Sequence, residues 1–395
     1  MSETQERPIY LDYQATTPVD RHVAEAMWPF FTEAFGNPHS VHHAHGREAG
    51  EAVEAARGEV AALLGVQGRE IVFTSGATES NNTALKGAAH FHARHFGKRH
   101  LVSVVTEHKC VLESCKRLEA EGFEVTYLPV QANGRIDPDA LRAAIRADTA
   151  IVSVMAVNNE TGVIQDIAAI GTICRERGVL FHTDAAQAAG KIPLDVNTAK
   201  VDLLSLSGHK LYGPKGVGAL YIRRRPRARI DALMDGGGQE RGMRSGTVPA
   251  PLAVGLGEAC RIARDELDTE HARLAGLQRR LRAGLETAIP DLAINGDLDH
   301  RIPGNLNVTI PGLDAETLIE NLDGIAVSTA SACSSASVEP SYVLTAMGLS
   351  DEAAAASLRI GLGRFTTEAE VDAAVRELTA TAQRLRAAGV SRLAV

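Results

Sequence analysis

The first two thirds of the chain alternates short runs of apolar, mostly β-branched residues with longer segments in which apolar residues return every three or four positions. This alternation predicts a mostly parallel sheet with helices on both faces. The strand-like runs are EIVFTSG, HLVSVVTEH, FEVTYLPV, TAIVSVMAV, VLFHTD, VDLLSLS and GVGALYI. The helix-like segments between them are ATESNNTALKGAAHF, KCVLESCKRLEAEG, PDALRAAIRA, DIAAIGTICRERG and AAQAAG. Upstream, REAGEAVEAARGEVAALLG predicts a helix that ends at Gly65.

The pattern changes after about Ala259. A long charged helix, RIARDELDTEHARLAGLQRRLRAGLETAI, precedes shorter strand-like and helix-like segments and a last helix from Thr367 to about Ala388. This part predicts a smaller α+β domain. The expected fold is therefore α/β with two domains. We expect a large domain over residues 17–259 and a small domain formed by residues 1–16 and 260–395, which carries the loop around Cys333.

Composition places the chain among soluble globular proteins, with 45% hydrophobic and 23% charged residues. The net charge of −8 gives no electrostatic reason to expect nucleic acid as a partner. A basic run, RRRPRAR over residues 223–229, is either a solvated loop or a weak docking patch. The N-terminus lacks the apolar segment of a signal peptide, and no run approaches the ~18 apolar residues that span a bilayer. We expect no membrane partner.

The five cysteines are an odd number without a CxxC pair, which argues against a disulfide framework and favours the reducing cytoplasm. Cys333 lies among small polar residues in STASACSSASVEPSYVL, where a thiol has the exposure and freedom that reactivity requires. Cys110, Cys115, Cys174 and Cys260 fall in helical patterns and are expected to be inert. The histidines of NPHSVHHAHG match no standard ligand spacing, so no metal site is expected.

Polar residues follow the ends of several predicted strands, where ligands bind in open α/β sheets. Ala77 and Thr78 begin a helix after IVFTSG; free N–H groups there suit a phosphate, although threonine is also an ordinary cap. His108 follows VSVVTE and is either a packed histidine or a catalyst. Asn159 lies in a polar cluster after IVSVMAV.

Two further strand ends carry the strongest candidates. Asp184 follows VLFHT, with Gln187 one helical turn later, although the carboxylate could simply cap the short helix AAQAAG. Ser207, His209 and Lys210 follow VDLLSLS in a loop bracketed by glycines. An anion site, a carboxylate, an aromatic lid and a lysine together match one cofactor, pyridoxal 5′-phosphate. The lysine would hold the cofactor's aldehyde as a Schiff base and later move protons.

Nine motifs in order carry a resemblance to a known family. They are YLDYQATTPVD, FGNPHS, EIVFTSGATESNN, TEHKCVL, VNNETGVIQDI, HTDAAQ, SGHKLYGPKGVGALY, GGGQERGMRSGT and SACSSASVEPSYVL. From about Ile9 to about Leu385 the chain resembles the cysteine desulfurases of the housekeeping, IscS/NifS-like group. These enzymes belong to the class V branch of fold-type I pyridoxal-phosphate enzymes, so the resemblance implies that fold.

The resemblance also implies a role for each matching residue. Lys210 resembles the Schiff-base lysine, Asp184 resembles the partner of the pyridine nitrogen, and His108 resembles the histidine stacked on the ring. Asn159 and Gln187 resemble the pair that orients the cofactor near its phenolic oxygen, and the phosphate cup is matched by Ala77, Thr78, Ser207 and His209. Thr247 resembles a residue that completes the phosphate site of the neighbouring subunit, Asn37 and Arg359 resemble the ligands of the substrate carboxylate, and Cys333 resembles the sulfur acceptor.

The implied reaction converts L-cysteine to L-alanine and leaves the sulfur as a persulfide on Cys333. The family implies a homodimer and a sulfur-acceptor protein such as an iron–sulfur scaffold, with Cys333 also able to contribute to a shared cluster. Members typically continue into a tail that docks the scaffold, whereas this sequence stops at AAGVSRLAV. The acceptor therefore stays open among a scaffold bound differently, a tRNA-thiolation relay, and a specialised pathway such as nitrogenase cluster assembly or DNA phosphorothioation.

Three other functions are weighed against this one. A transaminase of the same class has no need of Cys333 in a mobile loop. Selenocysteine lysis could share the whole apparatus. A silent homologue that only binds partners would be supported by loss of Lys210 or Cys333, and both residues are present.

Overall fold

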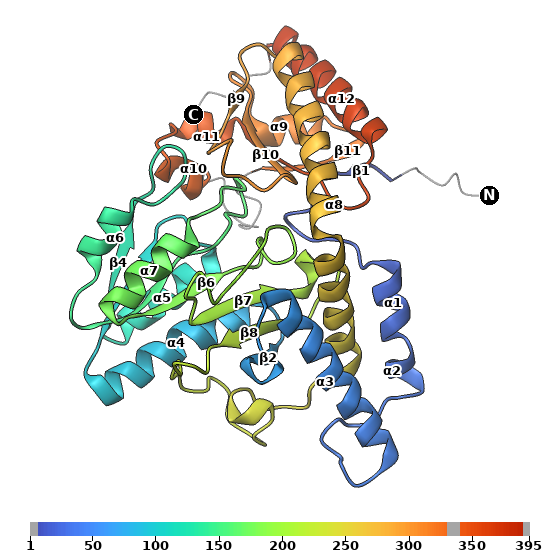
Figure 1. Cartoon of the computed structure of the whole chain (residues 1–395). Helices are drawn as coiled ribbons and strands as arrows, with labels where there is room; N and C mark the ends of the chain where they lie inside the picture. Colours follow the sequence, from blue (N-terminus) through green and yellow to red (C-terminus); the bar gives the residue numbers. More distant parts are fainter. Residues whose placement is uncertain (1–6, 330–339, 390–395) are drawn as a thin grey trace.

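The computed structural model describes residues 7–329 and 340–389, and its centre is a seven-stranded sheet (Figure 1). The strands lie in the order β2-β8-β7-β6-β5-β3-β4. Parallel pairing joins β4, β3, β5, β6 and β7, whereas β8 is antiparallel to both of its neighbours. The strands span Ile71–Thr74 (β2), His100–Val104 (β3), Glu124–Leu128 (β4), Thr149–Ser153 (β5), Leu180–Asp184 (β6), Leu203–Ser207 (β7) and Gly218–Ile222 (β8). The predicted mostly parallel sheet is confirmed.

Both faces of this sheet are buried, because successive residues of a strand point to opposite sides. Val72 and Leu101 pack in a cluster with residues of α4 and α5, whereas the adjacent Phe73 and Val102 pack in another with residues of α3 and α7. The helices of this part span Arg21–Met27 (α1), Pro29–Thr32 (α2), Ala44–Leu64 (α3), Ala77–Phe96 (α4), Lys109–Ala120 (α5), Pro138–Ala144 (α6) and Ile167–Arg177 (α7). Helices therefore cover both faces, as the sequence pattern predicts.

The remainder of the chain forms a second, smaller layer of strands and helices in the upper part of Figure 1. An antiparallel sheet has the order β12-β13-β10-β9, and β1 pairs in parallel with β11. Leu11, from the N-terminal segment, packs in the apolar cluster of this part. The elements span Ile9–Tyr10 (β1), Ala293–Ile294 (β9), Asn305–Thr309 (β10), Ala315–Glu320 (α9), Ile325–Ala326 (β11), Ser328–Thr329 (β12), Tyr342–Ala346 (α10), Asp351–Ala355 (α11), Ser357–Gly361 (β13) and Glu368–Ala387 (α12). The domain bounds themselves stay a prediction.

One long helix, α8 (Ala250–Ala288), runs along both parts of the molecule (Figure 1). Its first half packs in the cluster of the large sheet, and residues such as Leu277 and Leu281 of its second half pack in the other. The helix begins about ten residues earlier than its charged segment predicts. The reason is tertiary: a Cβ on Gly257 would lie 2.6 Å from Cα of Ala56, so this glycine permits the close packing of α8 on α3.

The predicted short helix AAQAAG is wrong. Residues 185–190 form turns, in which the N–H groups of Ala188 and Ala189 both donate to the carbonyl of Ala185. Gly190 ends the segment with a φ of +67°, which stops a helix that has barely one turn to nucleate. By contrast, the helix predicted to end at Gly65 is confirmed, since Gly65 caps α3 with a φ of +67°.

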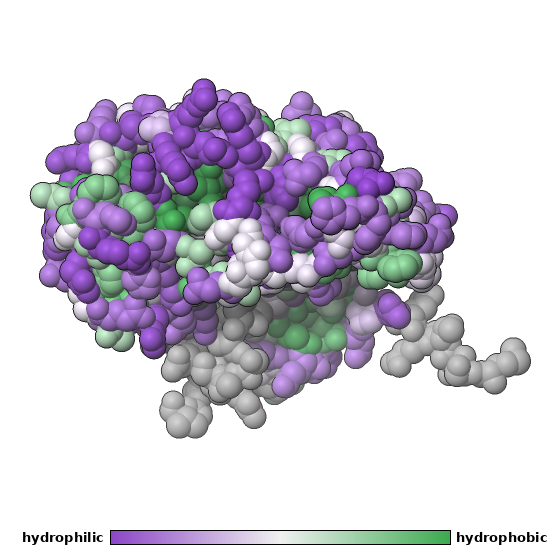
Figure 2. Space-filling model, turned by 90° about the horizontal axis from the view of Figure 1, so that it is seen from below, coloured by the Kyte–Doolittle hydropathy of each residue, from purple (hydrophilic) through white to green (hydrophobic). Residues whose placement is uncertain are grey.

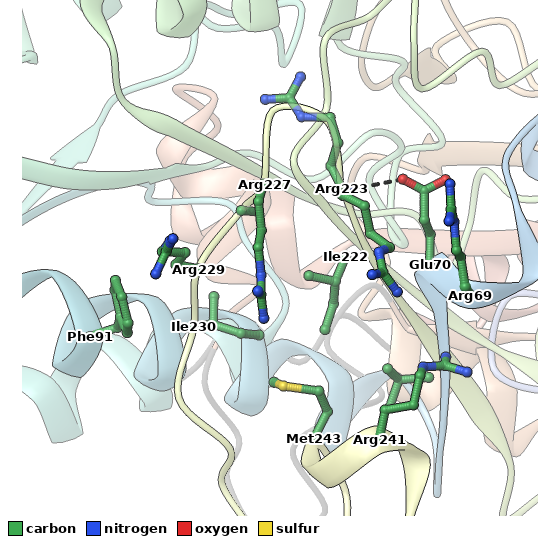
Figure 3. A pocket seen from close by; sticks show the side chains of 13 residues that line it. Arg69, Glu70, Phe91, Ile222, Arg223, Arg227, Arg229, Ile230, Arg241 and Met243 are labelled. Atoms are coloured by element: carbon green, nitrogen blue, oxygen red, sulfur yellow. Dashed lines mark hydrogen bonds between the residues drawn. The ribbon is translucent and has the colours of Figure 1, made fainter.

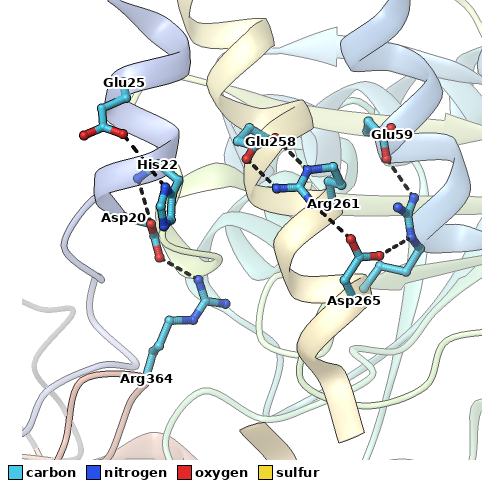
Figure 4. A network of polar contacts seen from close by, with 9 residues as sticks. Asp20, His22, Glu25, Glu59, Glu258, Arg261, Asp265 and Arg364 are labelled. Atoms are coloured by element: carbon cyan, nitrogen blue, oxygen red, sulfur yellow. Dashed lines mark hydrogen bonds and ion pairs between the residues drawn. The ribbon is translucent and has the colours of Figure 1, made fainter. Parts of the chain in front are cut away.

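A network of ion pairs joins the N-terminal helices to α8 and to the segment after β13 (Figure 4). Arg364 bonds to Asp20 at 2.9 Å and to Glu270 at 2.8 Å, and its side chain is only 11% exposed. Arg264 of α8 reaches Glu59 of α3 at 2.7 Å. The second pair is partly exposed, with side chains 36% and 37% exposed, and contributes little, about 0–1 kcal/mol. The buried contacts of Arg364 therefore do more to hold the two parts together.

A buried ion pair holds the loop between β8 and α8, and its loss should destabilise the fold. Both oxygens of Glu240 accept from Arg57, at 2.6 and 2.7 Å, and the side chains are 2% and 3% exposed. Glu240→Gln leaves the buried Arg57 charge with only the exposed carboxylate of Glu54, at 3.0 Å, as a partner among the described residues, so we expect the free energy of unfolding to fall by about 3 kcal/mol in urea titrations. Glu258→Gln, which breaks an exposed pair with Arg261, should cost about 1 kcal/mol or less. Equal effects would contradict this ranking.

The face of the molecule seen from below is mostly hydrophilic, and hydrophobic residues show through in small groups (Figure 2). Trp28, Phe31 and Phe35 are among the exposed large hydrophobic residues, at 66%, 52% and 65%. Across residues 7–329 and 340–389, no helix combines the length and apolar character needed to cross a membrane.

Candidate active site

Ten of the residues that the sequence nominates line one cavity of about 330 Å³. Asp184 ends β6, Ser207 ends β7, and both strands end at the same edge of the sheet. The nominated residues that line the cavity are Ala77, Thr78, His108, Asn159, Asp184, Gln187, Ser207, His209, Lys210 and Arg359. The structure thus brings together residues from 77 to 359, as expected for strand ends of an open α/β sheet.

Three nominated residues are not found in this cavity. Asn37 is exposed, and its side-chain oxygen accepts from the N–H of His39. Thr247 is also exposed, on the loop that Glu240 holds. Cys333 lies outside the described residues. Their roles stay predictions.

One end of the cavity is suited to an anion. Helix α4 begins after Gly76, whose φ of +153° suits glycine, and no side chain caps the helix. Thr78 therefore is not a cap, and the first N–H groups of a 20-residue helix face the cavity with the positive end of its dipole. A Cβ on Gly76 would lie 3.7 Å from Oγ of Ser207, in the space that a phosphate group would need.

The carboxylate of Asp184 is held on both oxygens. Asn81 donates to Oδ2 at 2.7 Å, and the N–H of Ala186 donates to Oδ1 at 2.9 Å. The second bond is the local contact that the capping interpretation expects, but no helix follows it. The carboxylate is thus fixed at the cavity wall and can face the protonated nitrogen of a bound ring.

His108 combines both of the roles considered for it. It caps α5, since its Nδ1 accepts from the N–H of Cys110 at 3.2 Å, and its ring also lines the cavity. Because Nδ1 is an acceptor, the ring proton resides on Nε2. Burial lowers the pKa of His108, and the charges of Lys210 and Lys109 lower it further, although Asp184 opposes this. His108 is therefore neutral at pH 7, and its uncharged ring forms part of the cavity wall.

Lys210 lies in a 3₁₀ turn, Gly208–Lys210, and its side chain meets the N-terminal segment of the chain. Nζ donates to the backbone oxygens of Gln14 and Ala15, the latter at 2.6 Å. Beside it, Nδ1 of His209 lies 3.1 Å from Oγ1 of Thr16. Burial and the charge of Lys210 lower the pKa of His209 to about 4, so this ring is neutral. Two carbonyl oxygens of the N-terminal segment thus hold the amino group of Lys210 at the cavity.

Arg359 of β13 contributes a buried guanidinium from the smaller part of the molecule. It is 1% exposed, and it donates to the carbonyl of Asn159 at 3.1 Å, to Asp12 at 2.8 Å and to Ser328 at 2.9 Å. Within the described residues, its Nε and Oδ1 of Asn159 are buried without a hydrogen-bond partner. Unpaired buried polar atoms are costly, so these two atoms indicate a missing ligand at this end of the cavity.

Comparison with known proteins assigns the chain to a family. The family model described as "Aminotransferase class-V" matches residues 9–374. The chain belongs to the class-V aminotransferase family. Two curated relatives, "Cysteine desulfurase" of Homo sapiens and "Cysteine desulfurase IscS" of Neisseria meningitidis, are each 57% identical to it. The alignments cover 96% and 97% of this chain and 83% and 94% of the relatives.

Solved structures agree with this assignment. The chain is similar to a "NIFS-LIKE PROTEIN" with a TM-score of 0.89 and 39% identity, over 96% of this chain and all of the other. It is also similar to "SspA in complex with cysteine", with a TM-score of 0.80 and 40% identity, over 91% of this chain and 100% of that one. The fold is that of fold-type I enzymes, as the sequence predicts.

The cofactor of this class-V enzyme is pyridoxal 5′-phosphate, and the residues present fit it. The uncapped start of α4 with Ser207 suits the phosphate, Asp184 suits the ring nitrogen, and Lys210 suits the aldehyde. The neutral His108 suits the face of the ring. Each group is placed by an element of the large sheet, which explains why the sequence pattern could nominate them.

Sequence reasoning missed part of the class-V site. Gln14 and Ala15 line the cavity and hold Lys210, although YLDYQATTPVD was noted only as a motif. Cys110, expected to be inert in a helix, also lines the cavity, with Nδ2 of Asn81 at 3.1 Å from its sulfur. Burial raises the pKa of its thiol to about 12, so it stays protonated. The position of Cys110 in the cavity was unexpected, whereas its protonated thiol agrees with the expectation that this cysteine is inert.

The histidine-rich segment and the basic run lie apart from this cavity. His43 caps α3 by accepting from the N–H of Gly46 at 3.2 Å. In the described part of the chain, no three metal-binding side chains gather at one place. Residues of the basic run line a second cavity of about 380 Å³, in which arginines surround apolar side chains such as Phe91, Ile230 and Met243 (Figure 3). Arg223 is buried against Asp202, whereas most of the run is exposed.

Proposed function

We propose that this class-V enzyme is a cysteine desulfurase, which converts L-cysteine to L-alanine and moves the sulfur onto Cys333. The observation that carries the proposal is the single cavity in which Lys210, Asp184 and the buried guanidinium of Arg359 meet. The relatives named as cysteine desulfurases at 57% identity support the same reaction. Cys333 itself is proposed from the sequence alone, because it lies outside the described residues.

Bound pyridoxal phosphate supplies an electrophilic aldehyde and an electron-withdrawing ring. Asp184 keeps a proton on the ring nitrogen. Arg359 orients the substrate carboxylate through Nε, a donor that has no other partner in the described residues. Asn159 would bind the same carboxylate through its Nδ2 donor, because its Oδ1 can only accept a hydrogen bond. Lys210 removes the proton from Cα of the substrate and returns it later, as a general base and acid. The neutral His108 packs on the ring and adds no competing charge.

Sulfur transfer requires a thiolate that can reach the substrate. The thiolate of Cys333 attacks the substrate sulfur, an S–S bond forms, and the C–S bond breaks. The electron pair of that bond stays with the carbon and is protonated, so the products are L-alanine and a persulfide on Cys333. No external oxidant is needed, because the sulfur that the substrate loses is the sulfur that Cys333 gains.

The proposal extends to partners and place. Thr247 is exposed and lies outside the cavity of its own chain, which supports a homodimer in which it completes the phosphate site of the other subunit. The persulfide sulfur then passes to an acceptor protein for iron–sulfur cluster assembly, with tRNA thiolation as a further destination. The four described cysteines are free, which suits a reducing compartment such as the cytoplasm.

The test is an assay of the purified protein with pyridoxal phosphate and L-cysteine. We expect alanine and sulfide in equal amounts with a reductant, and a persulfide on Cys333 by mass spectrometry without it. A keto acid in place of alanine would instead indicate transamination. Bound cofactor without any product from L-cysteine would overturn the proposed substrate, and selenocysteine would then be tried.

A further inference from the structure

A second lysine lies directly behind the cofactor cavity. Lys191 follows Asp184 by seven residues and Gln187 by four, after the turns that replace the predicted short helix. Its Nζ donates to Oε1 of Gln187 at 2.8 Å. Lys191 does not line the cavity itself, and no step of the proposed reaction uses it.

The bond from Lys191 decides which end of the Gln187 amide faces the site. An amide has one accepting and one donating end, whereas an ammonium group can only donate. Oε1 must therefore turn towards Lys191, and Nε2 turns the other way, where it donates to the carbonyl of Gln14 at 2.9 Å. That same carbonyl accepts from Lys210. A chain of polar contacts thus links Lys191, through Gln187 and Gln14, to the lysine of the active site.

The surroundings of Lys191 give it an unusual charge balance. Burial, together with the charges of Lys210 and Arg359 and against the opposing charge of Glu270, lowers the pKa of Lys191 to about 7. Glu270 is itself bonded to Arg364 at 2.8 Å, so it does not serve Lys191 alone. Removing a charged amino group from water costs free energy, and the amino group of Lys191 bonds to a single amide. This indicates a specific role for Lys191 in addition to packing.

We propose that Lys191 is a positioning residue, which fixes the amide of Gln187 with its N–H₂ end towards the bound cofactor. The inference rests on the proposed function, because the family resemblance implies that Gln187 contacts the cofactor near its phenolic oxygen. Without Lys191, only the carbonyl of Gln14 among the described residues holds the amide, so its N–H₂ end is less firmly fixed towards that oxygen. The expected consequences are weaker cofactor binding and a changed absorbance of the bound cofactor.

The first experiment measures pyridoxal phosphate binding to the apoprotein by titration and absorbance. Lys191→Met removes the donor but keeps an unbranched side chain, and we expect the Kd to rise by about tenfold, the worth of about one hydrogen bond. Lys191→Arg retains a donor and should bind nearly as well as wild type. The control is Lys98→Met, since Lys98 is also half-buried and donates to a single oxygen, that of Thr149 at 3.1 Å, away from the cavity.

A double-mutant cycle tests whether Lys191 acts through Gln187. If it does, Lys191→Met should add little to the Kd of a Gln187→Leu variant. Full, additive losses would overturn the inference. If Lys191→Met does not fold, Lys191→Leu also removes the donor and serves the same cycle.

A pH series on the apoprotein provides a second signature. The pKa of Lys191 is lower in the folded chain than in the unfolded chain, so the unfolded state binds more protons between pH 7 and about 10. The stability of wild type relative to Lys191→Met should therefore rise with pH across that window and stay flat below it. A flat difference throughout would contradict a pKa of Lys191 lowered by its surroundings.

The outcomes separate the two proposals. If wild type binds no pyridoxal phosphate, the proposed function fails. If wild type binds it and Lys191→Met matches Lys98→Met in affinity, absorbance and pH dependence, the proposed function stands and the role of Lys191 is refuted.

Discussion

Replacing Lys210 by alanine is expected to lower turnover of L-cysteine by about 10⁴-fold or more, because the residue serves as both the attachment point and the base. Nζ of Lys210 lies in the cavity wall between the backbone oxygens of Gln14 and Ala15. The variant should also lose the covalent link to the cofactor. In wild type, borohydride reduction followed by mass spectrometry should locate the cofactor on the peptide that contains Lys210.

Two controls make the result specific. Lys210→Arg keeps a positive charge in the same place, but a guanidinium does not lose its proton, so we expect it to be as inactive as alanine. Lys200→Ala removes a lysine whose Nζ bonds to Thr172, and neither residue lines the cavity. This variant should leave the cofactor attached. If Lys210→Ala still carries reducible cofactor on another lysine, the assignment is wrong.

The second large effect is expected from Cys333→Ser. The variant should bind pyridoxal phosphate as wild type does, since no described contact of the cavity involves residue 333, but alanine formation should fall by about 10³-fold or more. A serine hydroxyl is not ionised at neutral pH and is a poor nucleophile towards sulfur. The persulfide should disappear from the mass spectrum together with the activity.

Cys110 provides the contrast within the same chain. It lines the cavity, yet burial raises the pKa of its thiol to about 12, so it should carry no persulfide in wild type. Full turnover by Cys333→Ser, or a persulfide on Cys110, would contradict the proposed route of sulfur transfer.

The alternation of apolar runs was enough to predict the large sheet, its helices and the strand ends that carry Asp184 and Lys210. The reason is that ligands bind at the carboxyl ends of the strands in an open α/β sheet, so polar residues that follow apolar runs are candidates for the site. The same reasoning placed Gly65 at the end of α3, because a glycine with positive φ ends a helix by local geometry alone. The roles of residues that follow from their position along one strand could thus be predicted from the sequence.

Residues whose role depends on a contact with another element could not be predicted from the sequence. The start of α8 depends on the contact of Gly257 with Ala56, and the position of Cys110 in the cavity depends on how α5 lies against Asn81. Gln14 acts through its contact with Lys210, which no spacing in the sequence predicts. Local propensity and periodicity determined the elements and the strand-end chemistry. Only tertiary packing decided which buried groups meet, because those contacts join different elements, which in the case of Gln14 and Lys210 are 196 residues apart.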